Sequence, residues 1–244
     1  MVAAMRHVGI HQYSVEGAVL CYQEIMRGAQ ARLDAHQHPP VTMAGLAMAD
    51  TVTEWDEADN DALRARSAEV VERLARGGAE FFLCPDNTAH IALETPGPDL
   101  ALPGLHIGEV VASEARVRGY RKVGVLGTNW TMHGPVYPRA FEARGIGWAV
   151  PRPAVRERLH AIIMDELCMN RFEPESIEYY RSAIAALAAE GCDSVALVCT
   201  EIPLIIGNEN SALPVLDSTR LLARAAIDVA LGDAPLPIWR GGPV

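Results

Sequence analysis

Two stretches of the chain follow one pattern: Phe81-Phe82-Leu83-Cys84-Pro85-Asp86-Asn87-Thr88-Ala89-His90 and Val195-Ala196-Leu197-Val198-Cys199-Thr200-Glu201-Ile202-Pro203. Each begins with an apolar run that is typical of a buried strand. Each then changes to a thiol, a hydroxyl and an acidic or amide group where the next helix is expected. In open α/β sheets, ligands bind outside the carboxyl ends of the strands, and helix N-termini favour anionic groups there. We therefore expect both strand ends to face one bound carboxylate from opposite sides.

Strand-like and helical patterns alternate along the rest of the sequence. Such alternation predicts an α/β fold of mainly parallel sheets flanked by helices. Asn87 is the predicted N-cap of the helix after the third strand. The apolar runs predict strands at 6–11, 41–48, 81–84, 122–126, 147–150, 195–198 and 213–216. The amphipathic or charged segments predict helices at 15–33, 58–76, 108–118, 135–144, 156–168, 175–190 and 218–231.

The polar strand ends recur in pairs, which indicates two pseudo-symmetric lobes. The end that carries Ser14 resembles the one that carries Thr128 and Thr131, and the two stretches quoted above resemble each other. The Pro- and Gly-rich segment 95–104 is the predicted crossover. We expect residues 1–103 with 212–244 to form an N-terminal lobe that includes the returning C-terminal helix. Residues 104–211 then form the second lobe, and the active site lies in the cleft between the two.

The bulk composition limits the classes of partner. The chain has 244 residues, half of them hydrophobic, and a formal net charge of −10, which argues against nucleic acid or an anionic membrane. No uninterrupted apolar run approaches the roughly 18 residues of a membrane span, and no apolar leader begins the chain, so we expect a cytoplasmic protein. The five cysteines have scattered spacings, which favours reduced thiols over disulfides or a structural zinc site.

Several ordered motifs resemble the aspartate/glutamate racemase family, and together they span essentially the whole chain. The two signatures of that family are similar to Asn87-Thr88-Ala89-His90 and Cys199-Thr200-Glu201-Ile202-Pro203. Further similar segments are Lys122-Val123-Gly124-Val125-Leu126-Gly127-Thr128 with Thr131-Met132, His106-Ile107, residues 162–167 and Leu216-Asp217-Ser218-Thr219. The resemblance implies an amino-acid racemase or epimerase that needs no pyridoxal phosphate or other cofactor and no metal.

The resemblance also implies the catalytic pair. In the family, one base at each signature flanks the substrate α-carbon, and the first base, a cysteine in most members, directly precedes the Asn-Thr pair. Here that position holds Asp86, and the second base is Cys199. The first loop is commonly Gly-Gly-rich in the family, whereas this one reads His11-Gln12-Tyr13-Ser14 and is one residue shorter. No basic residue matches the one that members acting on acidic substrates often use, so we assign neither aspartate nor glutamate as substrate.

Inversion of a stereocentre without a cofactor requires one group that removes a proton from one face and another that delivers a proton to the opposite face. A thiol suits this task because its pKa lies near neutrality and falls at a helix N-terminus. Cys199 stands at a strand end, directly before an expected helix. The alternative for Cys199 is a buried, inert core cysteine.

Asp86 has three alternative roles. It is a base whose pKa, about 3.9 in solution, rises on burial in a closed cleft, and the unequal thiol/carboxylate pair then favours one direction kinetically. Alternatively, it binds the substrate ammonium while Cys84 acts as the base, because positions 84 and 86 share a strand face. In the third role it is a plain helix cap.

The remaining polar residues at the strand ends are candidate substrate ligands. Asn87, Thr88 and Thr200 offer donors to an α-carboxylate and to the charge that develops when the α-carbon loses its proton. Thr128, Thr131 and Ser14 are candidates on the other two loops, with ordinary turn or cap duty as the alternative. Glu201 either orients Cys199 or caps the following helix.

Three functions follow from these residues. The first is a two-base racemase or epimerase for an amino-acid or carboxylate substrate. The second is a decarboxylase or isomerase that uses Cys199 alone as proton donor or nucleophile. The third is a non-catalytic amino-acid-binding protein. Small α/β enzymes of this size often pair, so a homodimer is a candidate assembly, although no exposed apolar stripe argues for it.

Overall fold

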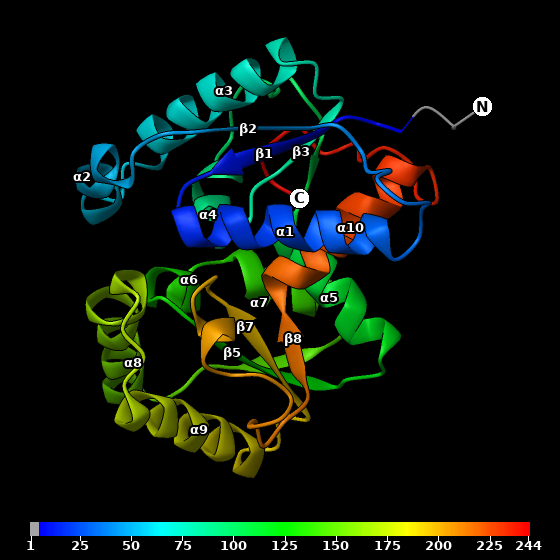
Figure 1. Ribbon diagram of the computed structural model, residues 1–244. Helices are drawn as coiled ribbons and strands as arrows, with labels where there is room; N and C mark the ends of the chain where they lie inside the picture. The colour runs from blue at the N-terminus through cyan, green and yellow to red at the C-terminus, as the bar shows by residue number, and fades with distance from the viewer. Residues whose placement is uncertain (1–4) are drawn as a thin grey trace. The chain divides into compact units, whose positions relative to one another are not determined.

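The computed structural model describes residues 5–244, which form two compact units (Figure 1). Unit 1 comprises the chain up to Ile107 together with Thr219–Val244, and unit 2 is Gly108–Ser218. Each unit contains one four-stranded parallel sheet with flanking helices. The α/β class that the alternating pattern predicts is therefore confirmed. None of the helices within residues 5–244 has the length and apolarity to cross a lipid bilayer.

The sheet of unit 1 has the strand order β2-β1-β3-β4, and every pairing is parallel. In this register, Val8 of β1 lies between Val41 of β2 and Phe81 of β3. The central strands are buried on both faces, which explains the apolar runs with which both begin. The strands are β1 (Val8–Gln12), β2 (Val41–Gly45), β3 (Phe81–Leu83) and β4 (Gly104–Leu105).

Helices cover both faces of this sheet. In Figure 1, α3 lies on one side of β1 and β2, and α1 and α10 lie on the other. Gly28 permits the close approach of α1 to α10, because a Cβ atom there would lie 2.2 Å from Ile227 Cδ1. The helices are α1 (Val15–Gln30), α2 (Val52–Asp56), α3 (Asn60–Arg76), α4 (Ala89–Leu93) and α10 (Ser218–Leu231), with the 3-10 turn η1 (Met48–Asp50).

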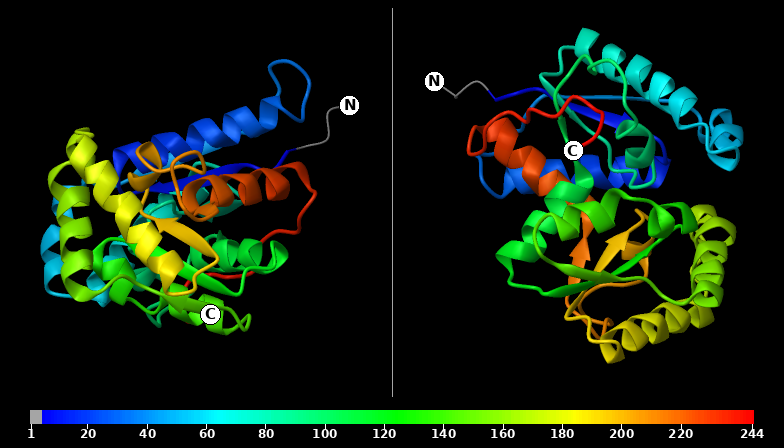
Figure 2. Two further views of the ribbon diagram at one scale, coloured as in Figure 1. Left: turned by 90° about the horizontal axis from the view of Figure 1, so that it is seen from below. Right: turned by 180° about the vertical axis from the view of Figure 1, so that it is seen from behind.

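The C-terminal segment beyond α10 returns to the sheet of unit 1, as the red trace in Figure 2 shows. The backbone N–H of Gly104 donates to the carbonyl of Trp239, and that of Leu100 donates to the carbonyl of Arg240. Gly242 N–H donates to the carbonyl of Leu93, the last residue of α4. The segment therefore holds both β4 and the end of α4.

Unit 2 repeats this arrangement with the strand order β6-β5-β7-β8, again all parallel. Its main core lies between the sheet and the pair α8 and α9, and includes Leu126, Leu159, Ile184 and Leu197. The strands are β5 (Lys122–Gly127), β6 (Gly147–Ala149), β7 (Ser194–Val198) and β8 (Val215–Asp217). The helices are α5 (Ile107–Val117), α6 (Asn129–His133), α7 (Val136–Glu142), α8 (Pro153–Asp165) and α9 (Pro174–Ala189), with the turns η2 (Leu167–Met169) and η3 (Ile202–Leu204).

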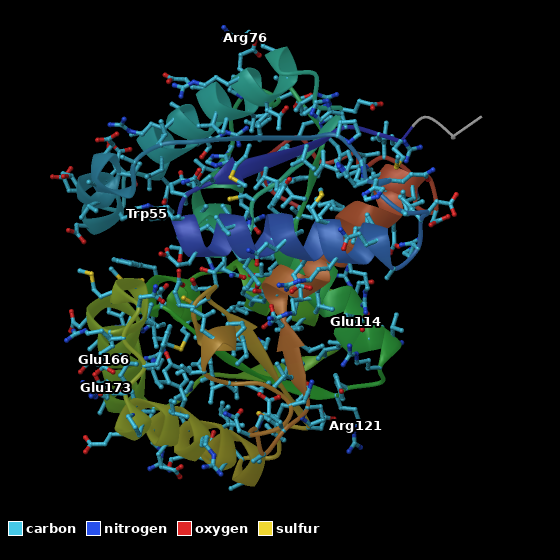
Figure 3. The ribbon with its side chains drawn as sticks, viewed as in Figure 1. Trp55, Arg76, Glu114, Arg121, Glu166 and Glu173 are labelled. Carbon is cyan, nitrogen blue, oxygen red and sulfur yellow. The ribbon has the colours of Figure 1, made fainter. Side chains whose placement is uncertain are left out.

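The short elements α2, α6 and β4 were not expected from the sequence, and neither was the turn η1. Tertiary contacts hold α2, since Trp55 (labelled in Figure 3) packs edge-on against Tyr13 and Glu54 pairs with Arg66 of α3. A local cap holds α6, in which Thr128 Oγ1 accepts from Thr131 N–H at 3.2 Å. The prediction that Asn87 is an N-cap was wrong, because α4 begins one residue later, with Thr88 at the N-cap position.

Candidate active site

The first group of candidate residues lies at the carboxyl edge of the unit 1 sheet. β1 and β3 are parallel neighbours in which Ile10 lies opposite Leu83, so the segments that follow them leave the sheet at the same edge. One segment carries Ser14, whose Oγ accepts from Gly17 N–H at 3.3 Å and caps α1. The other carries Asp86, Asn87 and Thr88. The structure thus brings these four residues to one edge of one sheet.

Asp86 is half-buried and is held at two points. Its Oδ1 accepts from Ala89 N–H at 2.9 Å, and its backbone carbonyl lies 3.0 Å from Nδ1 of His90. The carboxylate therefore performs capping duty at the start of α4, while Thr88 at the formal N-cap makes no side-chain capping bond. Asn87 is almost fully buried, and its Nδ2 lies 3.5 Å from the carbonyl of Pro85.

Cys84 differs from Asp86 in its surroundings. The strand β3 ends at Leu83, so the expectation that positions 84 and 86 share a strand face was wrong. Cys84 is fully buried in an apolar cluster with Phe82 and Leu93, and its Sγ lies 3.9 Å from the carbonyl oxygen of Asp86. Burial, followed by the nearby Asp86 carboxylate, raises the thiol pKa well above its usual value. These surroundings favour a packed thiol over a base.

His11 and Tyr13 also belong to this edge, although the sequence did not mark them as site residues. The two rings stack with centroids 4.8 Å apart, and Tyr13 Oη lies 3.1 Å from Ser67 Oγ. His11 is wholly buried, and neither ring nitrogen has a well-aligned hydrogen-bond partner among residues 5–244. Burial lowers its pKa from 6.5 to about 4, so the ring is neutral. The sequence could have indicated this place for His11, because it lies three residues before the candidate Ser14 at the end of the same strand.

The second group lies at the carboxyl edge of the unit 2 sheet. β5 and β7 are parallel neighbours in which Gly127 lies opposite Val198. Thr128 and Thr131 follow β5, both are buried, and their hydroxyl oxygens are 3.0 Å apart. Cys199 and Thr200 follow β7 and are also buried. The two groups thus occupy equivalent positions, because β3 and β7 are each the third strand of a sheet with the same order.

Cys199 contacts Glu201 directly. Its Sγ donates to Glu201 Oε2 at 2.9 Å, and the two residues are only 7% and 3% exposed. Glu201 makes no side-chain capping bond to the turn η3 that follows, so its side chain serves Cys199 rather than the helix start. The carboxylate therefore fixes the position of the thiol proton.

The pKa of Cys199 changes in the direction opposite to our expectation. We expected a helix start to lower it, but only a three-residue 3-10 turn follows, beginning at Ile202. Burial and then the negative charge of Glu201 raise the thiol pKa well above its ordinary value. At neutral pH the side chain is therefore a protonated thiol, which is a proton donor.

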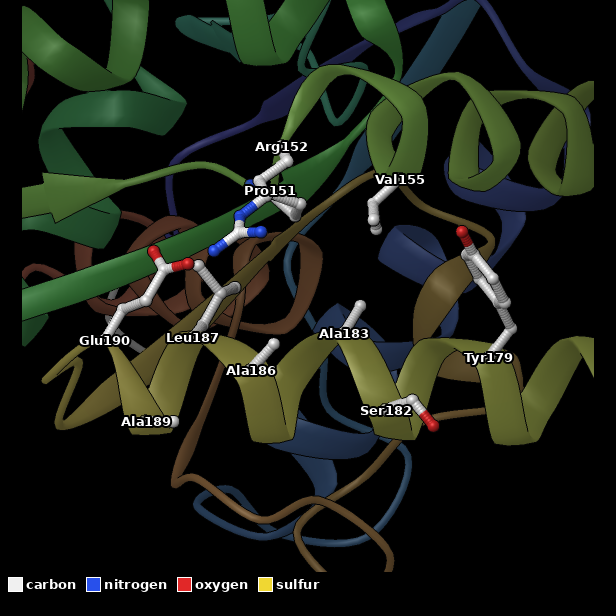
Figure 4. Close-up of a pocket in the computed structure, with 10 residues that line it drawn as sticks. All are labelled: Pro151, Arg152, Val155, Tyr179, Ser182, Ala183, Ala186, Leu187, Ala189 and Glu190. Carbon is white, nitrogen blue, oxygen red and sulfur yellow. The ribbon is translucent and has the colours of Figure 1, made fainter.

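The described residues contain no metal-binding cluster, and a hollow in unit 2 does not involve the candidate residues. Within residues 5–244 no group of three or more His, Cys, Asp or Glu side chains is arranged to hold a metal ion. A hollow of about 480 Å³ lies between α8 and α9 of unit 2 (Figure 4). Its lining is mainly apolar, with Arg152, Tyr179, Ser182 and Glu190 as polar members, and it includes none of the candidate residues.

Comparisons with known proteins agree with the fold. Residues 10–226 match the family model described as Asp/Glu/Hydantoin racemase. The chain is 23% identical over 176 residues to the broad specificity amino-acid racemase RacX of Bacillus subtilis, covering 71% of this chain and 74% of that one. It is 29% identical over 160 residues to a glutamate racemase of Thermus thermophilus, covering 64% of this chain and 57% of that one. The crystal structure of a putative Asp/Glu racemase from Yersinia pestis superposes with a TM-score of 0.82 at 28% identity, covering 93% of this chain and all of that one.

Proposed function

Because the chain belongs to the Asp/Glu/hydantoin racemase family, we propose that it is an amino-acid racemase or epimerase that inverts the α-carbon without a cofactor. One observation carries this proposal beyond family membership. In each unit, a group that can transfer protons follows the strand that is third in the order of the sheet. This group is Asp86 after β3 in unit 1 and Cys199 after β7 in unit 2. A two-base reaction needs two such groups, one for each face of the carbon.

The proton transfers follow from the ionisation of the two groups. The Asp86 carboxylate removes the α-proton from one face of the substrate. The Cys199 thiol, whose raised pKa keeps it protonated, delivers its proton to the opposite face. The products of the step are the inverted amino acid, a neutral Asp86 and a Cys199 thiolate. For the other enantiomer the roles reverse, and the thiolate is the base.

The ionisation of the resting enzyme makes the two directions kinetically unequal. A carboxylate with a protonated thiol is ready for the enantiomer whose α-proton faces Asp86. The opposite direction starts from a thiolate, which burial and Glu201 disfavour. This difference affects the rate in each direction at a given pH, and it leaves the equilibrium constant unchanged.

The other candidate residues serve the substrate carboxylate in this proposal. Asn87, Thr88 and Thr200 are next to the two bases in sequence, and their side chains carry amide or hydroxyl donors. Donors at the α-carboxylate also stabilise the charge that develops there in the transition state. Thr128, Thr131 and Ser14 line the neighbouring strand ends of the same two sheet edges. None of these residues is basic, which supports a substrate whose side chain is not acidic.

The test is α-proton exchange in D₂O. The protein is incubated with single l- and d-amino acids, and the α-proton signal is followed by NMR while chiral chromatography follows inversion. We expect the α-proton signal to disappear and the stereocentre to invert for at least one amino acid. In Cys199→Ala we expect neither exchange of the α-proton nor inversion. Release of CO₂ from an arylmalonate-type acid, or binding of an amino acid with no exchange, would contradict it.

Asp86→Asn separates the three roles of Asp86. Asparagine caps a helix as well as aspartate does, so the bond to Ala89 N–H is retained while the base is lost. If Asp86 is the base, kcat falls by orders of magnitude with little change in KM. A raised KM with nearly normal kcat would assign it to the ammonium instead, and unchanged kinetics would leave only the cap. Cys84→Ala is the matched variant and is expected to keep kcat.

A further inference from the structure

His90 makes two well-aligned hydrogen bonds that together determine where its proton is, and the Leu105 carbonyl acts on the ring more weakly than the Asp86 carbonyl. The backbone N–H of Ile107 lies 3.2 Å from Nε2, and the backbone carbonyl of Asp86 lies 3.0 Å from Nδ1. A backbone N–H can only donate and a carbonyl can only accept. Nε2 must therefore carry the lone pair and Nδ1 the hydrogen. Both bonds are satisfied by one neutral tautomer.

The surroundings of His90 maintain this state. The ring is fully buried, and burial followed by the neighbouring His106 lowers its pKa well below the usual value. His106 lies edge-on with a centroid distance of 4.8 Å, and its Nε2 is 2.8 Å from Glu94 Oε1. A protonated His90 would have no lone pair for Ile107, so the lowered pKa and this bond both favour the neutral ring.

The C-terminal segment packs against the rings of His90 and His106. The ring of Trp239 stacks on His90 at 6.0 Å and 13°, and meets His106 edge-on at 4.7 Å. Trp239 also accepts from Gly104 N–H through its carbonyl, while Gly242 N–H donates to the carbonyl of Leu93. The helix α4 is thus held at its far end by residues more than a hundred positions later in the chain.

The fixed ring bears on Asp86. The helix α4 has only five residues, too few for a stable helix on its own. Asp86 lies three residues before the first residue of α4, and the structure holds it by its carbonyl through His90 Nδ1 and by Oδ1 through Ala89 N–H. Without the bond to its carbonyl, the peptide group between Asp86 and Asn87 could rotate. The Asp86 α-carbon would then shift, and the carboxylate would point in another direction.

We propose that His90 is a positioning residue, which donates through Nδ1 to the Asp86 carbonyl and so aims the Asp86 carboxylate, with Trp239 and His106 holding the ring in place. The inference rests on the proposed role of Asp86 as a base. His90 itself transfers no proton in this scheme. Its importance lies in the donor at Nδ1, and the acceptor at Nε2 serves the fold alone.

Two substitutions separate these two bonds. In His90→Asn the side-chain amide can occupy the place of Nδ1 and donate to Asp86, but nothing reaches Ile107. In His90→Gln the longer side chain places its carbonyl oxygen near the site of Nε2, where it accepts from Ile107, and the donor to Asp86 is lost. Each variant loses one hydrogen bond and has a similar volume, so their thermal stabilities are expected to be close. His7→Gln is the control, because His7 bonds Thr42 at the opposite edge of the same sheet.

The kinetic readout uses an amino acid that the wild type exchanges in D₂O. A base displaced by about 1 Å costs on the order of a hundredfold in rate, so His90→Gln is expected to lower kcat by roughly that factor with KM little changed, while His90→Asn stays within a few-fold of wild type. His7→Gln is expected to match wild type. Equal kcat in His90→Asn and His90→Gln, whether both high or both low, would overturn the positioning role.

A second readout needs no substrate. In protein with ¹⁵N-labelled histidine, ring-nitrogen shifts are expected to show His90 as the Nδ1–H tautomer without titration, whereas free imidazole in histidine prefers the proton on Nε2. Amide exchange at Ala89, whose N–H bonds Asp86 Oδ1, is expected to rise more in His90→Gln than in His90→Asn. An Nε2–H tautomer, or equal exchange in the two variants, would contradict the inference. A wild type that exchanges no amino acid but passes these two measurements would instead count against the proposed function alone.

Discussion

At the scale of single residues, the contact between Cys199 and Glu201 bears on the ionisation of the proposed second base. A carboxylate 2.9 Å from a buried sulfur disfavours the thiolate by repulsion between like charges. The thiol is therefore a better acid than base near neutral pH. The sequence placed the thiol at a strand end, but it gave no sign of how the Glu201 side chain bends back to it. The expected direction of the pKa change was wrong because burial, and then the charge of Glu201, raise the pKa of the thiol.

The substitution Glu201→Gln tests this electrostatic contact. Removal of the negative charge is expected to lower the pKa of Cys199, while burial still keeps it above the ordinary value. In the direction in which Cys199 is the base, the alkaline rise of kcat/KM should therefore begin at lower pH. In the other direction, the alkaline fall should also begin at lower pH. The measurement is a pair of pH profiles, one from each enantiomer.

Glu190→Gln is the matched control, since Glu190 is an exposed acid of the same unit and is not among the main groups that shift the pKa of Cys199. Its profiles should coincide with those of the wild type. Profiles of Glu201→Gln that are unchanged, or shifted to higher pH, would show that Glu201 does not govern the thiol.

At the scale of elements, the long strands and helices could be predicted and the short ones could not. The strands β1, β5 and β7 have continuous apolar runs followed by polar turns, and the helices α1, α3 and α9 have regular apolar spacing. The two-residue strand β4 exists because the C-terminal segment and Phe82 hold it, and no local pattern marks it. The sequence places His90 in the helix after β3, but it does not predict the two backbone partners of the ring. These depend on how α4 packs against the start of α5.

The approach of β5 to β7 at their carboxyl ends depends on a glycine. A Cβ atom at Gly127 would lie 2.8 Å from both the carbonyl oxygen and Cγ2 of Val198, the residue before Cys199. Gly127→Ala should therefore push the two strand ends apart, destabilise the protein by about 1–3 kcal/mol and reduce kcat. Thermal unfolding and the exchange assay measure the two effects.

Gly147→Ala, in the neighbouring strand pair, is the comparison, because the nearest atom to its Cβ would be 3.3 Å away. Its unfolding free energy should change less and its kcat should be normal. A Gly127→Ala protein with the stability and kcat of the wild type would mean that the strand ends can separate without displacing Cys199.

At the scale of the whole molecule, burial of neutral imidazole makes stability depend on pH. The pKa of His11 is 6.5 in the unfolded chain and about 4 in the folded protein, so the unfolded state binds more protons between these values. The contribution of His11 to the free energy of unfolding is therefore fully present above pH 6.5. It is lost as the pH falls to about 4, which lowers the free energy of unfolding by about 3 kcal/mol. His90 adds to the same trend, since burial also lowers its pKa.

Urea unfolding of His11→Phe tests this dependence. Phenylalanine keeps a ring for the stack with Tyr13 but cannot be protonated. The loss of stability between pH 6.5 and about pH 4 should be smaller than in the wild type by about 3 kcal/mol. His38→Gln, at an exposed histidine, should show the full wild-type loss. Equal pH dependence in His11→Phe and wild type would mean that His11 is protonated as easily in the folded protein as in the unfolded chain.

The repeated topology of the molecule was visible in its sequence, because the polar residues that follow β1 and β3 reappear in kind after β5 and β7. In the proposed function each of these two repeated units supplies one base. In that proposal aspartate stands in place of the first cysteine usual in the family, so the two proposed bases are chemically unequal, and the isotopic course of the reaction tests the pair directly.

The most direct measurement is the fate of the α-hydrogen early in turnover in D₂O, followed by NMR and chiral chromatography from each pure enantiomer. With Asp86 and Cys199 on opposite faces, the inverted product should carry deuterium while the remaining substrate keeps its proton. Asp86→Asn and Cys199→Ala should each abolish this inversion. A product that retains the substrate's own hydrogen, or equal deuteration of both enantiomers from the start, would show that a single base serves both faces and would contradict the account.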